Sequence, residues 1–388
     1  MSNHLQKNLA ITLAVAALCI SPVGVSKAAA SGIVEPAQTA QAAEHSQAKP
    51  VAKSSQITVE VQPADPAREA WRAALLSTRR PKESCATATY PDKEWHDIPC
   101  VAPPARPIVK AGVRPHFVGG NFPDPILSVQ NGYIIDGEGS FDKVTGVTSV
   151  TTNGSPNTFT LQLNTNTFMT STCGSQPGCL GWVQFIYDSS AHLAFIQYWL
   201  EYATNCPPDW QPGDQGGCVR NGSGISIPNL RIADLGKIKL YGVMGSYLGN
   251  PYPDGVGLEI GNVFYEAFSN SPIADAMESW KQMEFNVFGD ENGPKAAFNS
   301  GSTLVVRDSM LLGTATQFSC FDNGSTTAEY NNLTVSNKTP LEAEVGPPSL
   351  VFVETYVNGT VAGTCGNGAI IIQGSNRVPI KPIVAHKP

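Results

Sequence analysis

Histidine is scarce in this sequence, and the short motifs that mark the common enzyme classes are missing. The chain has six histidines in 388 residues, and only His192 falls in a strand-rich part of the main domain. There is no HExxH motif, no GxSxG elbow, no Asp-Thr-Gly pair, no P-loop and no dinucleotide fingerprint. A lone histidine in such a setting is more often structural than catalytic, so we do not expect a Ser-His-Asp triad.

Charged residues are also few. They make up 15% of the chain, and the net charge is −7. Nucleic-acid binding needs a basic footprint, so we predict no nucleic-acid partner. A low density of carboxylates suits an acidic exterior, because fewer of them must be protonated as the pH falls.

The sequence has one long apolar run. Residues 9–20 form a short apolar stretch after Lys7, and small residues follow at 28–30. This order is typical of a secretory signal peptide, which we assign to residues 1–30. A membrane-spanning helix needs roughly 20 apolar residues, and no later stretch comes close. We therefore predict a secreted protein without a membrane span.

The cysteines fit an oxidising compartment. One of the nine, Cys19, lies in the signal peptide, which leaves an even number. The sequence lacks paired CxxC spacings, so we predict disulfides, no metal and no cofactor. Proximity favours the pairs Cys85–Cys100, Cys173–Cys179, Cys206–Cys218 and Cys320–Cys365.

Two regions follow the signal peptide. Residues 31–107 read as a disordered linker and candidate propeptide that contains a short helix and the Cys85–Cys100 loop. The helix is expected at 65–76, with Asp65 as N-cap and Pro66 at the first helical position. From residue 108 to 388, short β-rich runs alternate with Gly, Asn, Asp and Pro turns. This pattern predicts one all-β domain, an antiparallel β-sandwich or barrel, which we expect to be monomeric.

The strongest chemical candidates are two polar residues within apolar strands. Gln184 interrupts the run 182–187, and Glu284 interrupts the run 283–287. A half-buried strand turns one face to the core and the other outward. An amide and a carboxylate at such positions are the best candidates for chemistry in a chain with few histidines.

The strand predicted at 194–202 has two different faces. Side chains alternate along a strand, so one face carries Phe195, Gln197, Trp199 and Glu201. The other face is apolar and belongs against a core; it carries Ile196, Tyr198, Leu200 and Tyr202. Aromatic walls with two polar groups are typical of a substrate groove, and an ordinary exposed strand face is the alternative interpretation.

Several short segments together resemble the glutamic peptidases of the eqolisin type. In chain order these segments are Val183-Gln184-Phe185, Trp199-Leu200-Glu201-Tyr202, Pro207-Pro208-Asp209, Met283-Glu284-Phe285-Asn286-Val287 and Ala297-Phe298-Asn299. The family has a catalytic Gln, a Trp-Tyr-Glu-Trp strand and a catalytic Glu. The resemblance covers roughly residues 130 to 310, and Phe285 stands where the family has Trp.

The resemblance implies a fold and a mechanism. The fold would be a concanavalin-like jelly roll of two antiparallel sheets, secreted with a propeptide, that cleaves proteins or peptides at acid pH. Glu284 would act as the general base and Gln184 as the oxyanion donor. Trp199, Glu201 and Gln197 would bind substrate.

Two other functions remain open from the residues alone. The protein could be a carbohydrate-binding or glycoside-hydrolysing sandwich, with Trp199 and Tyr202 stacking on the sugar. Glu201 and Glu284 could be the two carboxylates of a glycosidase if they lie about 5–5.5 Å apart. The protein could also be a non-catalytic secreted sandwich that is stabilised by its disulfides. The relation between Gln184 and Glu284 in space separates these alternatives.

Overall fold

The computed structural model describes most of the chain beyond its N-terminal segment. The described residues are 65–77, 85–105, 125–213, 217–245, 254–290, 294–322, 329–336, 347–356 and 369–372. All of them belong to one compact unit, Ser55–Pro388. The expected signal peptide and the linker up to residue 64 lie outside the described residues, as does the interval 106–124.

The described strands form two large sheets and one small sheet. The ten-stranded sheet runs in the order β2 (His96–Asp97), β1 (Cys85–Thr89), β15 (Val263–Ser269), β14 (Asp254–Ile260), β13 (Ile238–Met244), β4 (Ile134–Thr145), β18 (Thr303–Gly313), β22 (Ser349–Thr355) and β21 (Thr334–Ser336), and β23 (Ala369–Ile372) pairs with β22. The nine-stranded sheet runs in the order β10 (Gln211–Pro212), β11 (Cys218–Asn221), β9 (Leu193–Glu201), β8 (Leu180–Asp188), β7 (Thr160–Thr165), β16 (Gln282–Phe288), β3 (Pro125–Val129) and β19 (Phe318–Asp322), and β12 (Ile225–Ser226) pairs with β9. The small sheet contains β20 (Tyr330–Asn331), β17 (Lys295–Phe298), β5 (Val150–Thr152) and β6 (Ser155–Pro156).

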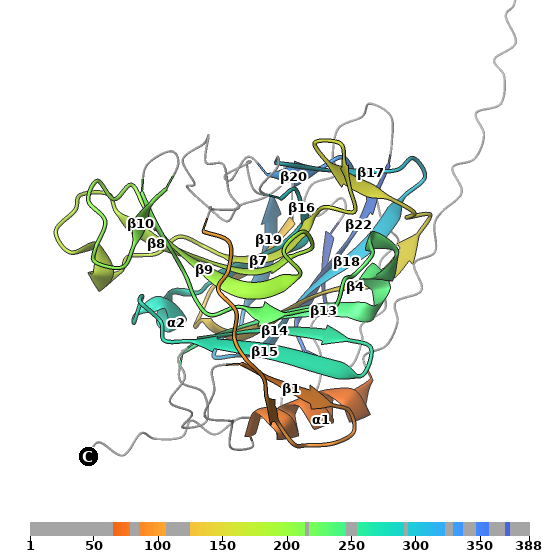
Figure 1. Ribbon diagram of the computed structural model, residues 1–388, viewed down its shortest axis with the longest axis horizontal. Coiled ribbons are helices and arrows are strands. Elements are labelled where there is room, and N and C mark those ends of the chain that lie inside the picture. Colours follow the sequence, from red (N-terminus) through yellow and green to blue (C-terminus); the bar gives the residue numbers. More distant parts are fainter. Residues whose placement is uncertain are drawn as a thin grey trace, which may run out of the picture. The chain divides into compact units, whose positions relative to one another are not determined.

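The large sheets pack face to face as an antiparallel sandwich. Their described strand pairs are all antiparallel, and the one parallel pair joins β17 to β20 in the small sheet. In Figure 1 the strands β13, β14 and β15 form a layer beneath β8 and β9. The prediction of an all-β antiparallel sandwich is therefore confirmed.

Helices are few among the described residues. They are α1 (Pro66–Ser77), α2 (Ala276–Ser279) and two 3-10 helices, η1 (Ser171–Cys173) and η2 (Ile232–Lys237). The expected helix at 65–76 is confirmed, and Asp65 caps it by accepting a hydrogen bond from the Ala67 backbone N–H at 3.0 Å. A proline at the first helical position removes only a donor that the helix would leave unpaired.

Aromatic side chains of the nine-stranded sheet fit over glycines of the ten-stranded sheet. A Cβ at position 139 would lie 2.0 Å from Cγ of Phe285, and one at position 242 would lie 2.4 Å from Cδ2 of Phe185. Both rings are fully buried. No side chain can therefore replace these glycines without moving an aromatic ring, which fixes how the two sheets face each other.

The sandwich includes residues on the N-terminal side of the expected boundary at residue 108. Strand β1 pairs antiparallel with β15 along Cys85–Thr89, and β2 pairs with β1. The Cys85–Cys100 disulfide closes the loop that carries β2. This segment contributes main-chain hydrogen bonds to the ten-stranded sheet, which composition and spacing could not indicate. Among the described residues, no helix is long and apolar enough to span a bilayer.

Three of the four expected disulfides are present. Cys85–Cys100, Cys173–Cys179 and Cys206–Cys218 join cysteines with Cα–Cα distances of 5.3, 5.7 and 5.4 Å. Cys320 is also disulfide-bonded, but its expected partner, Cys365, lies outside the described residues. These bonds close short loops within the sandwich and constrain its unfolded state.

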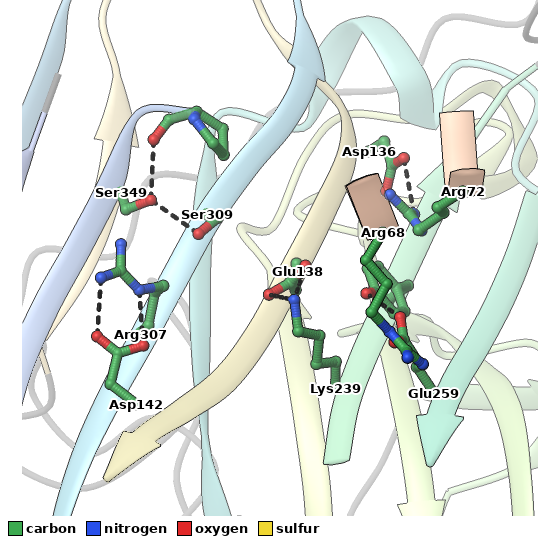
Figure 2. Close-up of polar contacts among 12 residues, drawn as sticks. Arg68, Arg72, Asp136, Glu138, Asp142, Lys239, Glu259, Arg307, Ser309 and Ser349 are labelled. Atoms are coloured by element: carbon green, nitrogen blue, oxygen red, sulfur yellow. Dashed lines mark hydrogen bonds and ion pairs between the residues drawn. The ribbon is translucent and has the colours of Figure 1, made fainter. Parts of the chain in front are cut away.

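Helix α1 is held against the outer face of the ten-stranded sheet by buried ion pairs. Arg72 donates to both carboxylate oxygens of Asp136 at 3.0 and 2.9 Å, and its guanidinium lies 3.7 Å from the centroid of the Tyr241 ring. Arg68 pairs with Glu259, which also accepts from the Tyr241 hydroxyl at 2.9 Å. Figure 2 shows these contacts beside the Glu138–Lys239 and Asp142–Arg307 pairs of the same sheet. Apolar packing adds to them, because Trp71 and Leu75 join a cluster with Ala88, Tyr241 and Phe264.

Replacing Asp136 with Asn should destabilise the protein. Arg72 is 8% exposed and Asp136 is 5% exposed, so the variant leaves a buried cation without its counter-charge, at a cost of about 3 kcal/mol. Chemical denaturation measures this loss. The control is Arg231→Ala, because Arg231 pairs with Asp234 but its side chain is 75% exposed, and the expected loss is below about 1 kcal/mol. Equal losses in the two variants would contradict the role of Asp136.

Candidate functional site

Gln184 and Glu284 lie in one transverse row of polar side chains. Asn164 of β7 is paired with Glu284 of β16 on one side and with Gln184 of β8 on the other. The row continues to Gln197 of β9 and Asn221 of β11. Paired residues in an antiparallel sheet point to the same face, so all five side chains share one face of the nine-stranded sheet. The strands that carry the row can be followed in Figure 1.

This face is the one opposite the main core. Phe285, Phe185 and Ile196 alternate with the row residues along their strands, and all three belong to the main core. Tyr198 and Leu200 are also in that core, as predicted from the two faces of this strand. Because side chains alternate along a strand, the row points away from the packed interface between the two large sheets.

The row is nevertheless buried. Gln184, Glu284, Asn164 and Gln197 are each 0% exposed, and Trp199 is 2% exposed. Trp182 and Val219 pack with Trp199 in one cluster. The expectation of an open groove on this face is therefore not met in this conformation. A polar row can be buried only if its groups are hydrogen-bonded.

Trp199 sets the orientation of the amides in the row. Its indole N–H, which can only donate, donates to Oε1 of Gln184 at 2.9 Å and to Oε1 of Gln197 at 3.1 Å. Both amides must therefore turn their nitrogen away from Trp199. Gln184 Nε2 then donates to Oε1 of Gln162 at 2.9 Å and to Oδ1 of Asn164 at 3.3 Å.

Every branch of this network ends on a group that can accept. Asn164 Nδ2 donates to Oε2 of Glu284 at 3.1 Å. Gln162 Nε2 donates to both carboxyl oxygens of Glu329 at 3.2 Å. On the other side, Gln197 donates to Asn221 at 3.0 Å, and Asn221 donates to the backbone carbonyl of Pro104 at 2.8 Å. One donor at the centre and acceptors at the ends leave a single consistent direction for every amide.

The side chain of Asn164 occupies the space between the two predicted catalytic groups. It is a carboxamide, with its oxygen facing the Gln184 amide nitrogen and its nitrogen facing the Glu284 carboxylate. A peptide bond offers the same two groups, a carbonyl oxygen and an N–H. Gln184 and Glu284 thus already hold an amide between them, although that amide belongs to the protein.

Glu201 lies on the same face but far from this row. It is four residues beyond Gln197 in β9 and pairs with Leu180, which places it roughly 13 Å along the strand. Glu284 is three strands away from β9, which adds roughly 14 Å across the sheet. The two carboxylates are too distant for the glycosidase pair that needs about 5–5.5 Å.

Four side chains of the network were not among the sequence candidates: Gln162, Asn164, Asn221 and Glu329. Gln162 and Asn164 lie in the strictly alternating segment 158–164, and alternation alone places them on one face of that strand. Glu329 directly precedes β20, and nothing in the surrounding sequence connects it to Gln184. Within the described ranges, no group of three or more His, Cys, Asp or Glu side chains could hold a metal ion.

Comparisons with known proteins add no assignment. No protein-family description, no curated protein and no solved structure matches the chain. The function must therefore be argued from the site itself.

Replacing Trp199 with Phe tests the central donor. The variant keeps an aromatic ring but leaves the buried Oε1 atoms of Gln184 and Gln197 without this donor, at a cost of about 2–4 kcal/mol. The matched control is Trp182→Phe in the same cluster, because the Trp182 indole donates to one carbonyl only, that of Thr165, at 2.8 Å. Chemical denaturation should show the larger loss for Trp199→Phe, and the reverse order would contradict the central role of Trp199.

Replacing Glu201 with Gln should change how stability depends on pH. Burial raises the pKa of Glu201 to about 7 from its ordinary value of 4.5. The folded state therefore keeps a proton that the unfolded state has lost, and stability falls as pH rises between these values. At pH 8 the variant should be more stable than wild type by up to about 3 kcal/mol, and at pH 4 the two should agree. Glu94→Gln, at an exposed position, controls for net charge; a constant difference for Glu201→Gln would contradict the assignment.

Proposed function

We propose that the protein is an acid-acting endopeptidase of the glutamic type, with Glu284 and Gln184 as its catalytic pair. The observation that carries the proposal is the amide of Asn164, held between Gln184 Nε2 and Glu284 Oε2. A pair that holds one carboxamide through its oxygen and its nitrogen is suited to hold a scissile peptide bond in the same way. The substrate class is protein or peptide, and the reaction needs no cofactor.

The proposed reaction is the addition of water to the peptide carbonyl. Glu284 takes a proton from the attacking water, whose oxygen forms a bond to the carbonyl carbon. Gln184 donates an N–H to the oxygen that becomes negative. The C–N bond then breaks, and Glu284 returns the proton to the leaving amine. Carboxylates are weaker bases than imidazole and lose their charge only at lower pH, so a carboxylate can serve as the base in acid, where a histidine would be protonated.

Substrate binding requires an exchange of hydrogen bonds. Both N–H groups of Gln184 are engaged, one with Gln162 at 2.9 Å and one with Asn164 at 3.3 Å. The longer contact is the weaker, and it lies on the side of Glu284. The carbonyl oxygen of the substrate would therefore replace the Asn164 oxygen, which requires the buried row to become accessible. We expect low activity in the conformation described here, in which Gln184 and Glu284 are 0% exposed.

The buried carboxyl groups support work in acid. Burial raises the pKa of Asp254 to about 6, that of Glu201 to about 7 and that of Glu329 to about 8. The folded state favours the neutral, protonated form of each of these acids. Their contribution to stability therefore increases as the pH falls through these values, which favours an acidic environment over a neutral one.

The finer features of the fold and of the location are part of the same proposal. A concanavalin-like jelly roll is supported by sheet orders in which β4 lies between β13 and β18, and β16 between β7 and β3. Secretion is supported by the sequence of residues 1–30 and by the disulfides. Because β1 and α1 contribute to the sheet and its outer cluster, we expect any propeptide removal to spare residues 65–105.

Digestion of a protein substrate tests the catalytic pair. Purified protein, before and after acid incubation, is assayed from pH 2 to 7 with wild type, Glu284→Gln and Gln184→Ala. We expect Glu284→Gln to abolish cleavage and Gln184→Ala to lower kcat by about 100-fold or more, as for other oxyanion donors. Glu94→Gln, which alters an exposed carboxylate, should keep kcat. Equal activity of Glu284→Gln and wild type would eliminate the proposed base.

The burial of Gln184, Asn164, Gln197 and Glu284 favours one alternative function. The three amides among them are hydrogen-bonded and 0% exposed, as in a polar network whose only role is to hold strands together. In that case the protein is a non-catalytic secreted sandwich. It would show no cleavage at any pH, before or after acid incubation, and Glu284→Gln would affect stability alone.

A further inference from the structure

Glu329 is a buried carboxyl group at the end of the second branch from Gln184. It is 1% exposed and lies next to β20. Both of its oxygens accept from Gln162 Nε2 at 3.2 Å, and Oε1 of Gln162 accepts from Gln184 Nε2 at 2.9 Å. One amide therefore separates Glu329 from the predicted oxyanion donor.

We infer that Glu329 is a positioning residue that fixes the orientation of the Gln184 amide through Gln162. The expected effect of Glu329 on the reaction rate rests on the proposed function, whereas its expected effect on the Gln162 and Gln184 amides does not. An amide can turn by 180° and exchange its oxygen and nitrogen. The carboxyl group of Glu329 holds the nitrogen of Gln162 on one side, so that the oxygen of Gln162 faces Gln184.

Loss of Glu329 would remove most of this constraint. The other partner of Gln162 Nε2 is the Thr160 hydroxyl at 2.9 Å, which itself donates to the Gly289 carbonyl at 2.7 Å. A hydroxyl can reverse its direction, so it tolerates either face of the Gln162 amide. If Gln162 turned, its nitrogen would meet the nitrogen of Gln184, and two donors would face each other. The Gln184 N–H that faces Gln162 would then lose its acceptor, while Trp199 would still hold the oxygen of the Gln184 amide.

The Glu329→Gln variant can distinguish positioning from proton transfer. Burial, together with the negative charge of Asp290, raises the pKa of Glu329 to about 8, so the group is neutral in acid. A neutral carboxyl still accepts through its carbonyl oxygen, and so does the amide of a glutamine. Glu329→Gln should therefore keep the direction of Gln162, whereas Glu329→Ala cannot.

Glu354 offers a matched control. It is also a fully buried carboxyl that accepts from amides, from Asn286 at 2.9 Å and from Asn331 at 3.2 Å. Glu354→Ala thus removes the same kind of acceptor from a neighbouring pair of amides, while the contact from Gln162 to Glu329 stays in place.

The geometric test uses NMR signals of the side-chain amides in full-length protein labelled with 15N-glutamine. In Glu329→Ala we expect the NH2 signals of both Gln162 and Gln184 to shift or broaden. In Glu329→Gln and Glu354→Ala the Gln184 signal should keep its wild-type position. An unchanged Gln184 signal in Glu329→Ala would overturn the inference, whatever the activity of the protein.

The kinetic test measures kcat and KM on an internally quenched peptide at pH 4. Glu329→Ala should lower kcat by about tenfold to 100-fold, less than the loss of the donor itself, with KM nearly unchanged. Glu329→Gln should restore kcat to within about threefold of wild type, which a proton-transfer role would forbid. A wild-type kcat in Glu329→Ala, with Glu284→Gln inactive, would overturn this inference alone. If wild type and Glu284→Gln are equally inactive, the proposed function fails, and the NMR result still decides the role of Glu329.

Discussion

The register of four neighbouring strands is the constraint on which the site depends. Strands β16, β7, β8 and β9 align one amide or carboxylate each, from Glu284 to Gln197. Side chains alternate with a period of two, so a slip of one residue would turn the polar row into the core and the aromatic residues outward. The close packing of the Phe285 ring on Gly139 and of the Phe185 ring on Gly242 opposes such a slip. Close packing on one face of the sheet therefore aligns the polar groups on the other face.

Within that register, the indole of Trp199 gives the amides their direction. The side-chain amide of Asn or Gln keeps its shape when it turns by 180°, but the turn exchanges its oxygen acceptor with its nitrogen donor. A row of such amides therefore has a defined direction only next to a group that can only donate or only accept. Trp199 is such a donor, and the Pro104 carbonyl is such an acceptor. Burial strengthens each bond and raises the cost of a wrong orientation. The network therefore has one favoured arrangement, which is the property that a preorganised oxyanion donor needs.

Local features could be predicted from the sequence because their causes are local. The helix behind Asp65, the disulfides between nearby cysteines and the core face of Tyr198 and Leu200 each depend on spacing within one segment. The position of Asn164 between Gln184 and Glu284 depends on which strands are neighbours, and pairing of distant strands leaves little trace in one sequence. The addition of β1 to the sheet and the approach of Glu329 to Gln162 are also long-range pairings. The burial of the row could not be foreseen, because alternation shows that a face is polar but not what covers it.

The saturation of the network need not prevent catalysis, and the magnitudes show why. Giving up the contact between Gln184 and Asn164, at 3.3 Å, costs about the net value of one neutral hydrogen bond, roughly 0.5–1.5 kcal/mol. An N–H aimed at a developing oxyanion supplies about 2.7–4 kcal/mol in a water-excluded site. The exchange thus favours the transition state even from a fully bonded row. Under the proposed function, access of the substrate to the buried face, and not the availability of the donor, is then the step that limits the reaction.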